Sequence, residues 1–250
     1  MLKKLTVEDF AVLRGSLESG RQSPNSLGTA LFLGAFMQGL FYYITYYIAA
    51  EYTVFPNVEI IKMVHFWITA LLISFSIIYA IPPIFMRSQK IQYFLVILMS
   101  QNLGAAFCYL GALFLIGEGE NISIVSLMNF TIITLIIGIL FFLVISIRFY
   151  ILLQKGKYRK GSKKDKLRGR FETTSYLPVV IVASTGFVFI LQFLFRTFQF
   201  ADYETFFLIV LGLLIFYAMI FVLPEQLVIL YCKFRFKSFN YDRKGYLLDE

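Results

Sequence analysis

Two ionisable side chains interrupt the longest apolar stretches of the chain, and they are the first candidates for chemistry. Arg148 lies seven residues before Lys155, and Glu225 lies eight residues before Lys233. Charged residues inside a membrane are costly and usually pair or face a polar cavity. Both stretches are predicted to run from the outer to the inner side, so the two side chains should lie at similar depth. We predict an Arg148–Glu225 ion pair; the alternative is that each side chain reaches the inner headgroups separately.

Three amide side chains lie near the middle of apolar stretches, namely Gln38, Gln101 and Asn102. Such an amide often hydrogen-bonds to a neighbouring helix, and each bond contributes roughly 0.6–2 kcal/mol. The same three groups could instead contact a neutral solute. Both interpretations stay open, and interhelical bonding is the simpler one.

Aromatic and basic side chains mark the predicted outer ends of the first two spans. The only histidine, His65, lies between Lys62 and Trp67, and we interpret it as an interfacial side chain rather than a proton relay. Tyrosine is typical of the headgroup level. We therefore predict an aromatic belt from the tyrosines at the end of the first span, which are Tyr42, Tyr43, Tyr46, Tyr47 and Tyr52.

Three prolines predict bends near the inner ends of two spans. Proline lacks a backbone donor and clashes with the preceding turn. Pro82 and Pro83 fall near the end of the second span, and Pro224 precedes Glu225 in the last one. Together with Arg148 they could line a polar vestibule that opens inward, although membrane prolines are often packing features alone.

The sequence contains none of the common enzyme motifs, and we expect no cofactor, no metal and no catalytic residue. HExxH, GxSxG and GxxxxGK[ST] are missing, as are paired carboxylates within a span. Cys108 and Cys232 fall at different depths, so we predict no disulfide. An energy-coupling nucleotide site, if one is needed, must come from another chain.

Composition and long apolar runs indicate an all-α integral membrane protein. Hydrophobic residues make up 59% of the 250 positions and charged residues only 15%, against about 25% charged in soluble domains. Runs of about 20 or more apolar residues are long enough to cross a bilayer. We predict six transmembrane helices, at about 27–50, 62–86, 91–116, 122–153, 176–195 and 205–232.

A strongly basic segment between the fourth and fifth spans orients the chain. Residues 155–170 hold nine Lys or Arg and one acid, Asp165. Because cationic loops stay on the cytoplasmic side, both termini are predicted to be cytoplasmic in the cell membrane. The charges lie beside spans, so they do not point to nucleic acid. We expect the segment to contact the anionic inner leaflet or another protein subunit through Lys155, Lys157, Arg159, Lys160, Lys163, Lys164, Arg168 and Arg170.

A short amphipathic helix is predicted near the N-terminus. Thr6 resembles an N-cap, and Val7, Phe10, Leu13 and Leu17 follow at helical spacing. The helix could lie in the inner membrane interface or pack on the protein itself. The chain is thus divided into residues 1–26 with this helix, spans in 27–153, the basic loop 154–176, spans in 177–232, and a basic aromatic tail 233–250.

Small residues line one side of the predicted third span. Ser100, Gly104, Cys108 and Ala112 recur every fourth residue. Such a stripe lets another helix approach closely. We therefore predict close helix packing along this face.

The outline resembles the membrane subunit of type-2 ATP-binding-cassette exporters, with an amphipathic N-terminal helix, six spans and cytoplasmic termini. Those subunits contact their ATPase through the inner loop between the second and third spans, which here is only Arg87–Lys90. Since the spans hold little charge, we predict the membrane component of a transport system for an apolar or amphipathic solute. The alternative is an accessory, assembly or immunity subunit of a larger membrane complex without transport.

Overall fold

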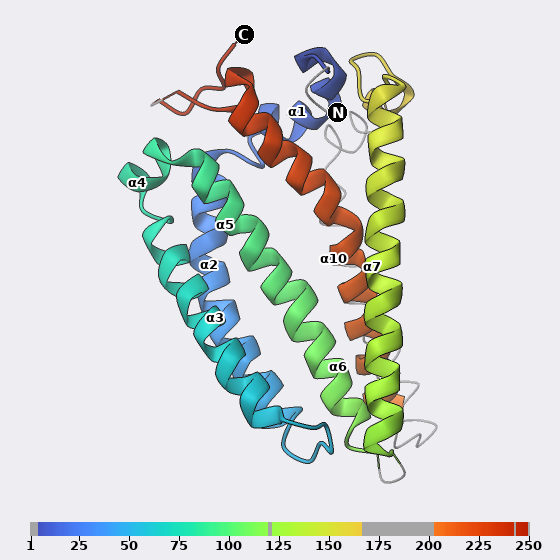
Figure 1. Cartoon of the computed structure of the whole chain (residues 1–250). Helices are drawn as coiled ribbons and strands as arrows, with labels where there is room; N and C mark the ends of the chain where they lie inside the picture. The colour runs from blue at the N-terminus through green and yellow to red at the C-terminus, as the bar shows by residue number, and fades with distance from the viewer. Residues whose placement is uncertain (1–4, 120–121, 167–202, 243, 250) are drawn as a thin grey trace.

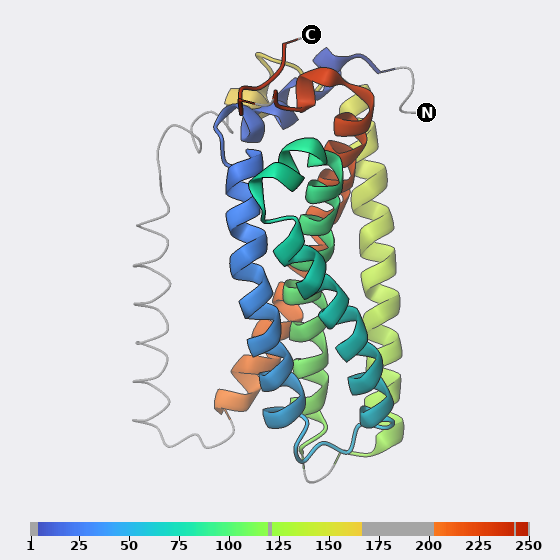
Figure 2. The same cartoon turned by 90° about the vertical axis from the view of Figure 1, so that its left-hand side faces the viewer.

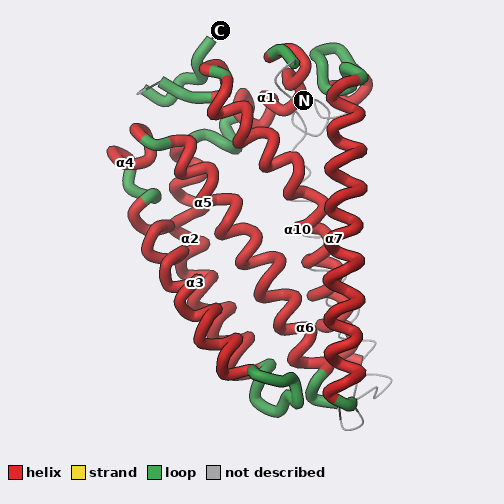
Figure 3. Tube along the Cα trace, viewed as in Figure 1, coloured by secondary structure: helices red, strands yellow, loops and turns green. Residues whose placement is uncertain are grey.

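The computed structural model describes residues 5–119, 122–166, 203–242 and 244–249. Helices make up most of this part of the chain, as Figure 3 shows, and an isolated bridge joins Tyr241 to Leu247 in the tail. The predicted span 176–195 lies outside the described residues.

Five described helical stretches are long and apolar enough to cross a membrane, which confirms an all-helical, multi-pass membrane protein (Figure 1). They are α2 (Pro24–Tyr43) with η3 (Ile44–Ile48), α3 (Val58–Ile78), α5 (Gln89–Gln101) with η4 (Asn102–Phe107) and α6 (Cys108–Ile116), α7 (Ile124–Gln154), and α10 (Tyr203–Arg235). These stretches match five of the six predicted spans.

Serine caps explain where two of these helices begin. The Ser23 hydroxyl accepts a hydrogen bond from the Ser26 N–H at 3.3 Å, and Pro24 occupies the first turn of α2. The Ser123 hydroxyl accepts one from the Ser126 N–H at 3.1 Å at the start of α7. A cap satisfies a backbone donor that the first helical turn leaves open, and proline is tolerated there because it has no such donor.

The paired prolines end the second span earlier than predicted. α3 stops at Ile78 rather than near residue 86, and a separate short helix, α4 (Pro82–Arg87), follows. Ile81 is extended, with φ −80° and ψ 123°, as the residue before a proline prefers. The predicted break at Pro82 and Pro83 is therefore confirmed, and it separates two helices.

The small-residue stripe of α5–α6 packs against α10. A Cβ atom added to Gly212 of α10 would stand 2.7 Å from the Cys108 carbonyl oxygen and 3.1 Å from the Ala112 Cβ. A Cβ added to Gly104 would stand 2.7 Å from the Met219 Cγ. The predicted close approach of another helix is confirmed, and α10 is that helix.

The two chain termini lie at the same end of the bundle, together with the basic segment after α7 (Figures 1 and 2). We call residues 5–22, residues 155–166 and the described residues of 236–249 the terminal cap. The N-terminal part of the cap holds η2 (Val7–Phe10) and α1 (Ala11–Glu18), and the tail holds η5 (Lys237–Phe239). One hydrophobic cluster joins all three parts, with Leu13, Tyr158 and Phe239 as members. The N-terminal helix thus packs on the protein, the second of the two predicted placements.

The last turn of α7 and the first turn of α10 lie toward opposite ends of the bundle (Figure 2). Residues 167–202 connect them in the sequence. This is the arrangement that the predicted sixth span requires.

Candidate functional site

A buried polar network joins the first three spans. Gln38 comes from α2, Tyr46 from η3, His65 and Thr69 from α3, and Asn102 from η4. Each of these five residues is at most 6% exposed. The network therefore lies inside the bundle rather than at its lipid-facing surface.

Asn102 lies at the centre of the network. Its Oδ1 lies 2.8 Å from His65 Nε2, and its Nδ2 donates to Gln38 Oε1 at 3.1 Å and to Thr69 Oγ1 at 3.3 Å. The Tyr46 hydroxyl lies 2.8 Å from the other imidazole nitrogen, Nδ1. A neutral imidazole has one donor and one acceptor nitrogen, and here both are used. The hydrogen bonds consequently connect three spans through one amide.

The Gln38 amide has spare hydrogen-bonding capacity. In the orientation above, Gln38 Nε2 is buried and has no hydrogen-bond partner among the described residues. The orientation of an amide is assigned from its partners, and reversing both amides would leave Gln38 Oε1 unpaired instead. A buried polar atom without a partner costs about 1–3 kcal/mol. In either orientation, one buried polar atom of Gln38 has no hydrogen-bond partner among the described residues.

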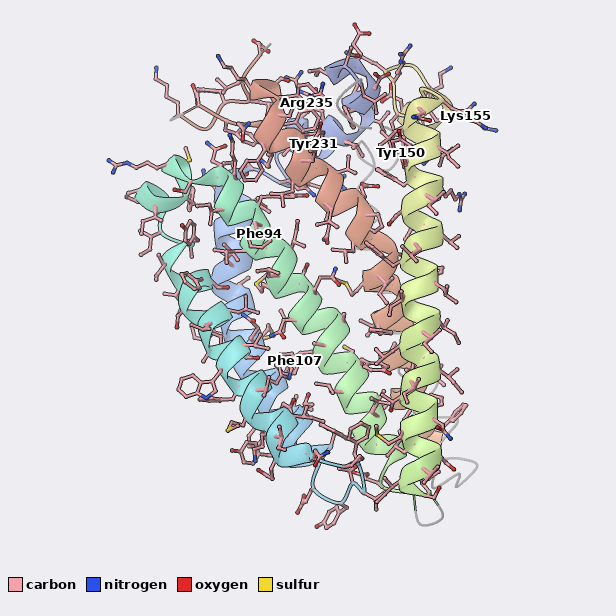
Figure 4. The ribbon with its side chains drawn as sticks, viewed as in Figure 1. Phe94, Phe107, Tyr150, Lys155, Tyr231 and Arg235 are labelled. Carbon is pink, nitrogen blue, oxygen red and sulfur yellow. The ribbon has the colours of Figure 1, made fainter. Side chains whose placement is uncertain are left out.

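Two π-helical stretches carry part of the network. Tyr46 lies on η3 and Asn102 begins η4. A π-helical turn inserts an extra residue, and such turns are frequent at functional sites. The Phe107 ring, labelled in Figure 4, comes from the other end of η4 and lies 4.4 Å from the His65 ring, centre to centre. Aromatic packing thus encloses the imidazole.

Two sequence interpretations of this region are wrong. His65 is not interfacial, and Tyr46 does not belong to the aromatic belt, because each buries its polar group against the other. Tyr43 and Tyr47 are about half exposed, as the belt predicts. His65 and Thr69 are four residues apart, so both lie on one face of α3. This spacing was the sequence signal that could have indicated a shared polar face on that helix.

The third predicted amide belongs to a different contact. Gln101 donates to the Met219 carbonyl at 3.3 Å and to Gln226 Oε1 at 3.4 Å, both on α10. Pro224 lies five residues after Met219 on the same helix, and it leaves the carbonyl of Ile220, four residues before it, without its usual backbone donor. α10 continues through Pro224 as one helix, and the predicted bend there stays a prediction.

A small apolar pocket lies between α7 and α10. It has a volume of about 210 Å³, and Phe142, Ser146, Phe149, Leu153, Pro224 and Val228 are among its lining residues. The Ser146 hydroxyl is buried and has no hydrogen-bond partner among the described residues. The pocket therefore combines apolar walls with one free polar group.

Arg148 and Glu225, the predicted ion pair, are close in the sequence to residues that line this pocket. Arg148 is exposed on α7, and Glu225 is half-buried on α10. Asp9–Arg159 and Arg14–Glu18 form ion pairs within the described part of the chain. The Arg148–Glu225 pair stays a prediction.

The basic segment is partly engaged inside the terminal cap. The Arg159 Nε lies 2.7 Å from Asp9 Oδ1, and the Val12 N–H donates to the Tyr158 carbonyl at 2.9 Å. The Lys164 Nζ donates to the Tyr158 hydroxyl at 2.6 Å. Burial favours the neutral form of Asp9, but hydrogen bonds from Thr6 and Arg159 outweigh this and hold its pKa below the usual value.

The remaining cations of the basic segment point to solvent or lie outside the described residues. Lys155, Lys157, Lys160 and Lys163 are exposed. Lys155 lies at the same end of the bundle as Tyr231 and Arg235 (Figure 4). Arg168 and Arg170 are outside the described residues. The exposed lysines remain available for lipid or protein contacts.

Comparison of the chain with protein-family models, with curated proteins and with solved structures finds no match. Within the described ranges, no three His, Cys, Asp or Glu side chains lie close enough together to hold a metal ion. The function must therefore be argued from the geometry of this chain.

Proposed function

We propose that the protein is the membrane component of a transport system for an apolar or amphipathic solute. The pocket between α7 and α10 is the observation that carries this proposal. At about 210 Å³, it is smaller than the roughly 300–1,000 Å³ of drug-sized pockets. It suits a small solute or one end of a larger one. Its apolar walls favour a mostly apolar body, and the Ser146 hydroxyl suits one polar group.

In this proposal, the protein crosses the cell membrane six times with both termini in the cytoplasm. The terminal cap then faces the anionic inner leaflet, where its exposed lysines are attracted to lipid headgroups. Because the sequence lacks a nucleotide-binding motif, any ATP-driven step would need another protein subunit.

Photolabelling tests the solute pocket directly. The purified protein in lipid nanodiscs is labelled with a diazirine-bearing medium-chain alcohol, and labelled residues are mapped by mass spectrometry. We expect saturable labelling around Val228 and Pro224 that excess octanol prevents. The variant Val228→Trp should fill the pocket and reduce this labelling at least about tenfold, the effect of losing about 1.4 kcal/mol of binding.

The matched control places the same tryptophan outside the pocket. Val222 lies on the same helix, is 42% exposed and is not a lining residue. Val222→Trp should leave labelling unchanged. Labelling spread evenly along the exposed faces of α7 and α10 would contradict the proposed pocket.

Exposed lysines of the terminal cap favour a second candidate, an accessory subunit of a larger membrane complex. Lys155, Lys160 and Lys163 extend from the cap and could contact an acidic protein face. Amine-directed cross-linking in intact membranes, followed by mass spectrometry, tests this idea. A stoichiometric partner cross-linked to these lysines, combined with no saturable photolabelling of the pocket, favours the accessory role.

A further inference from the structure

A cleft of about 490 Å³ opens where α4 turns into α5, beside the end of α10 and the C-terminal tail. The side chain of Gln89, at the start of α5, fixes one wall to the tail. Its Nε2 donates to the Tyr241 carbonyl at 2.8 Å, and its Oε1 accepts from the Tyr241 N–H at 2.9 Å. Asn240 Nδ2 donates to the Lys233 carbonyl at 2.9 Å and ties the tail to α10. The walls of the cleft are therefore held in place by hydrogen bonds.

The charges around the cleft have one sign. Arg87, Lys90 and Lys237 line it, and its lining residues, all of them described, include no Asp or Glu. None of the three cations has a carboxylate within 4 Å among the described residues, in contrast to Arg159. Lys90 Nζ lies 5.2 Å from the centre of the Phe234 ring. Three cations without carboxylate partners in one cleft favour an anionic occupant.

The start of α5 adds to this preference. Ser88 occupies the N-cap position, and its side chain makes no hydrogen bond to the first turn. Backbone N–H groups at the start of a long helix carry partial positive charge and favour anions. Ser88 and Gln89 both line the cleft. The helix end thus reinforces a site that the cations already define.

Apolar side chains line the cleft beside the cations. Ile91 and Phe234 line it and are 46% and 61% exposed. Both lie on helices that continue into the membrane-spanning bundle. A ligand that carries a phosphate next to an apolar body matches this combination of cationic and apolar lining residues.

We propose that this cleft binds the phosphate-bearing headgroup of one anionic phospholipid. Arg87, Lys90 and Lys237 would contact the phosphate, and Ile91 and Phe234 would contact the glycerol and the upper acyl chains. The site differs from the diffuse attraction of the exposed basic segment, because it holds a single lipid. The proposal assumes that the chain lies in a membrane, but it does not depend on whether the protein transports a solute.

Native mass spectrometry of the detergent-purified protein, titrated with phosphatidylglycerol, tests the site. We expect one lipid to bind more tightly than all later ones, and more tightly than phosphatidylcholine. Each of Arg87→Gln, Lys90→Gln and Lys237→Gln should weaken this first binding about fivefold, and the triple variant about 100-fold. Thermal unfolding without lipid checks that the variants are folded, and the single variants suffice if the triple variant is not.

The control removes the same charge from the same end of the bundle. The triple variant Lys155→Gln, Lys160→Gln, Lys163→Gln should keep the first lipid. Equal loss in this control, or unchanged binding in the cleft variants, would overturn the proposal. Equally tight phosphatidylcholine binding would also overturn it, as would displacement of the lipid by inorganic phosphate at matched concentration, since the ligand would then be a soluble anion.

Discussion

Asn102 shows how one side chain can organise a membrane bundle. Its side chain forms hydrogen bonds with three residues on two other spans, namely Gln38 on α2 and His65 and Thr69 on α3. Inside a bilayer these groups cannot be satisfied by bulk water, so each depends on the others. The network therefore favours one arrangement of α2, α3 and η4.

Replacing Asn102 by leucine should destabilise the protein by about 2 kcal/mol. The substitution roughly keeps the volume but removes three hydrogen bonds, each worth about 0.6 kcal/mol on average in a membrane protein. It also leaves His65 and Gln38 with unpaired polar atoms. Unfolding by sodium dodecyl sulfate, followed by circular dichroism, measures the change.

Gln101→Leu provides the control one residue earlier. Gln101 makes longer hydrogen bonds, of 3.3 and 3.4 Å, and contacts α10 instead of the network. We expect a loss below about 1 kcal/mol. Equal losses for the two variants would mean that the buried network has no special weight in stability.

At the scale of elements, the contact of α10 with α5–α6 depends on glycine. Gly212→Ala should destabilise the protein by about 1–3 kcal/mol, the usual cost of overpacking. The new methyl group would stand 2.7 Å from the Cys108 carbonyl oxygen, which is backbone and cannot turn away. The same unfolding assay measures the loss.

Gly111→Ala tests the same change on α6 where space is open. A Cβ atom at Gly111 meets nothing within 4 Å. Alanine is the better helix former by about 1 kcal/mol, so this variant should be neutral or more stable. If Gly212→Ala behaved in the same way, the close contact between the helices would be wrong.

A carboxylate links two elements of the terminal cap, and the link should depend on pH. Asp9 accepts from the Thr6 N–H at 2.9 Å and pairs with Arg159. The pKa of Asp9 is lower in the folded protein than in the unfolded chain, where it is near 3.9. The carboxylate therefore stabilises the folded protein at pH values above the unfolded-state pKa. This stabilisation is lost as the pH falls through the folded-state pKa. Asp9→Asn should therefore lower stability at pH 7, by about 1 kcal/mol as for a lost helix cap. Below about pH 4 it should make progressively less difference.

Thermal unfolding in a nonionic detergent at pH 7 and pH 3 checks this dependence. Glu8→Gln removes the neighbouring exposed carboxylate and should change little at either pH. A constant difference between the native protein and Asp9→Asn at both pH values would show that the charge of Asp9 does not matter.

The sequence predicted these elements well where the signal is local. Apolar runs predicted five described spans, the prolines at 82 and 83 predicted a break, and the small-residue stripe of α5–α6 predicted a close neighbour. A sequence pattern within one helix cannot show whether contacts from another helix stabilise it. At Pro224, for example, α10 continues as one helix although proline lacks a backbone donor.

For the molecule as a whole, the sequence predicted individual polar residues better than their grouping. Gln38 and Asn102 were expected to share a region and do so, but Gln101 faces α10. His65 and Tyr46 were assigned to the interface because each is amphipathic when taken alone. Their burial depends on a bond between two helices, and no spacing within one helix reveals which groups will meet.

The number of crossings gives the last prediction. Cysteine placed at Glu51, Lys160 or Lys244 lies outside the described spans, at positions that are exposed. The native cysteines lie within spans, Cys232 is buried and Cys108 is half-buried, so background labelling by an impermeant maleimide should be low. In intact cells, Glu51→Cys should react fully, whereas Lys160→Cys and Lys244→Cys should react only after the membrane is permeabilised, because cationic segments stay inside.

The pair at 160 and 244 decides between five and six spans. α10 is one crossing between these positions, so their location on the same side requires a second crossing within residues 167–202. Labelling of the two cysteines from opposite sides would leave five spans and would separate the C-terminal tail from the basic segment. That result would also contradict the terminal cap, since Phe239 and Tyr158 share one hydrophobic cluster with Leu13 only if both segments lie on the same side of the membrane.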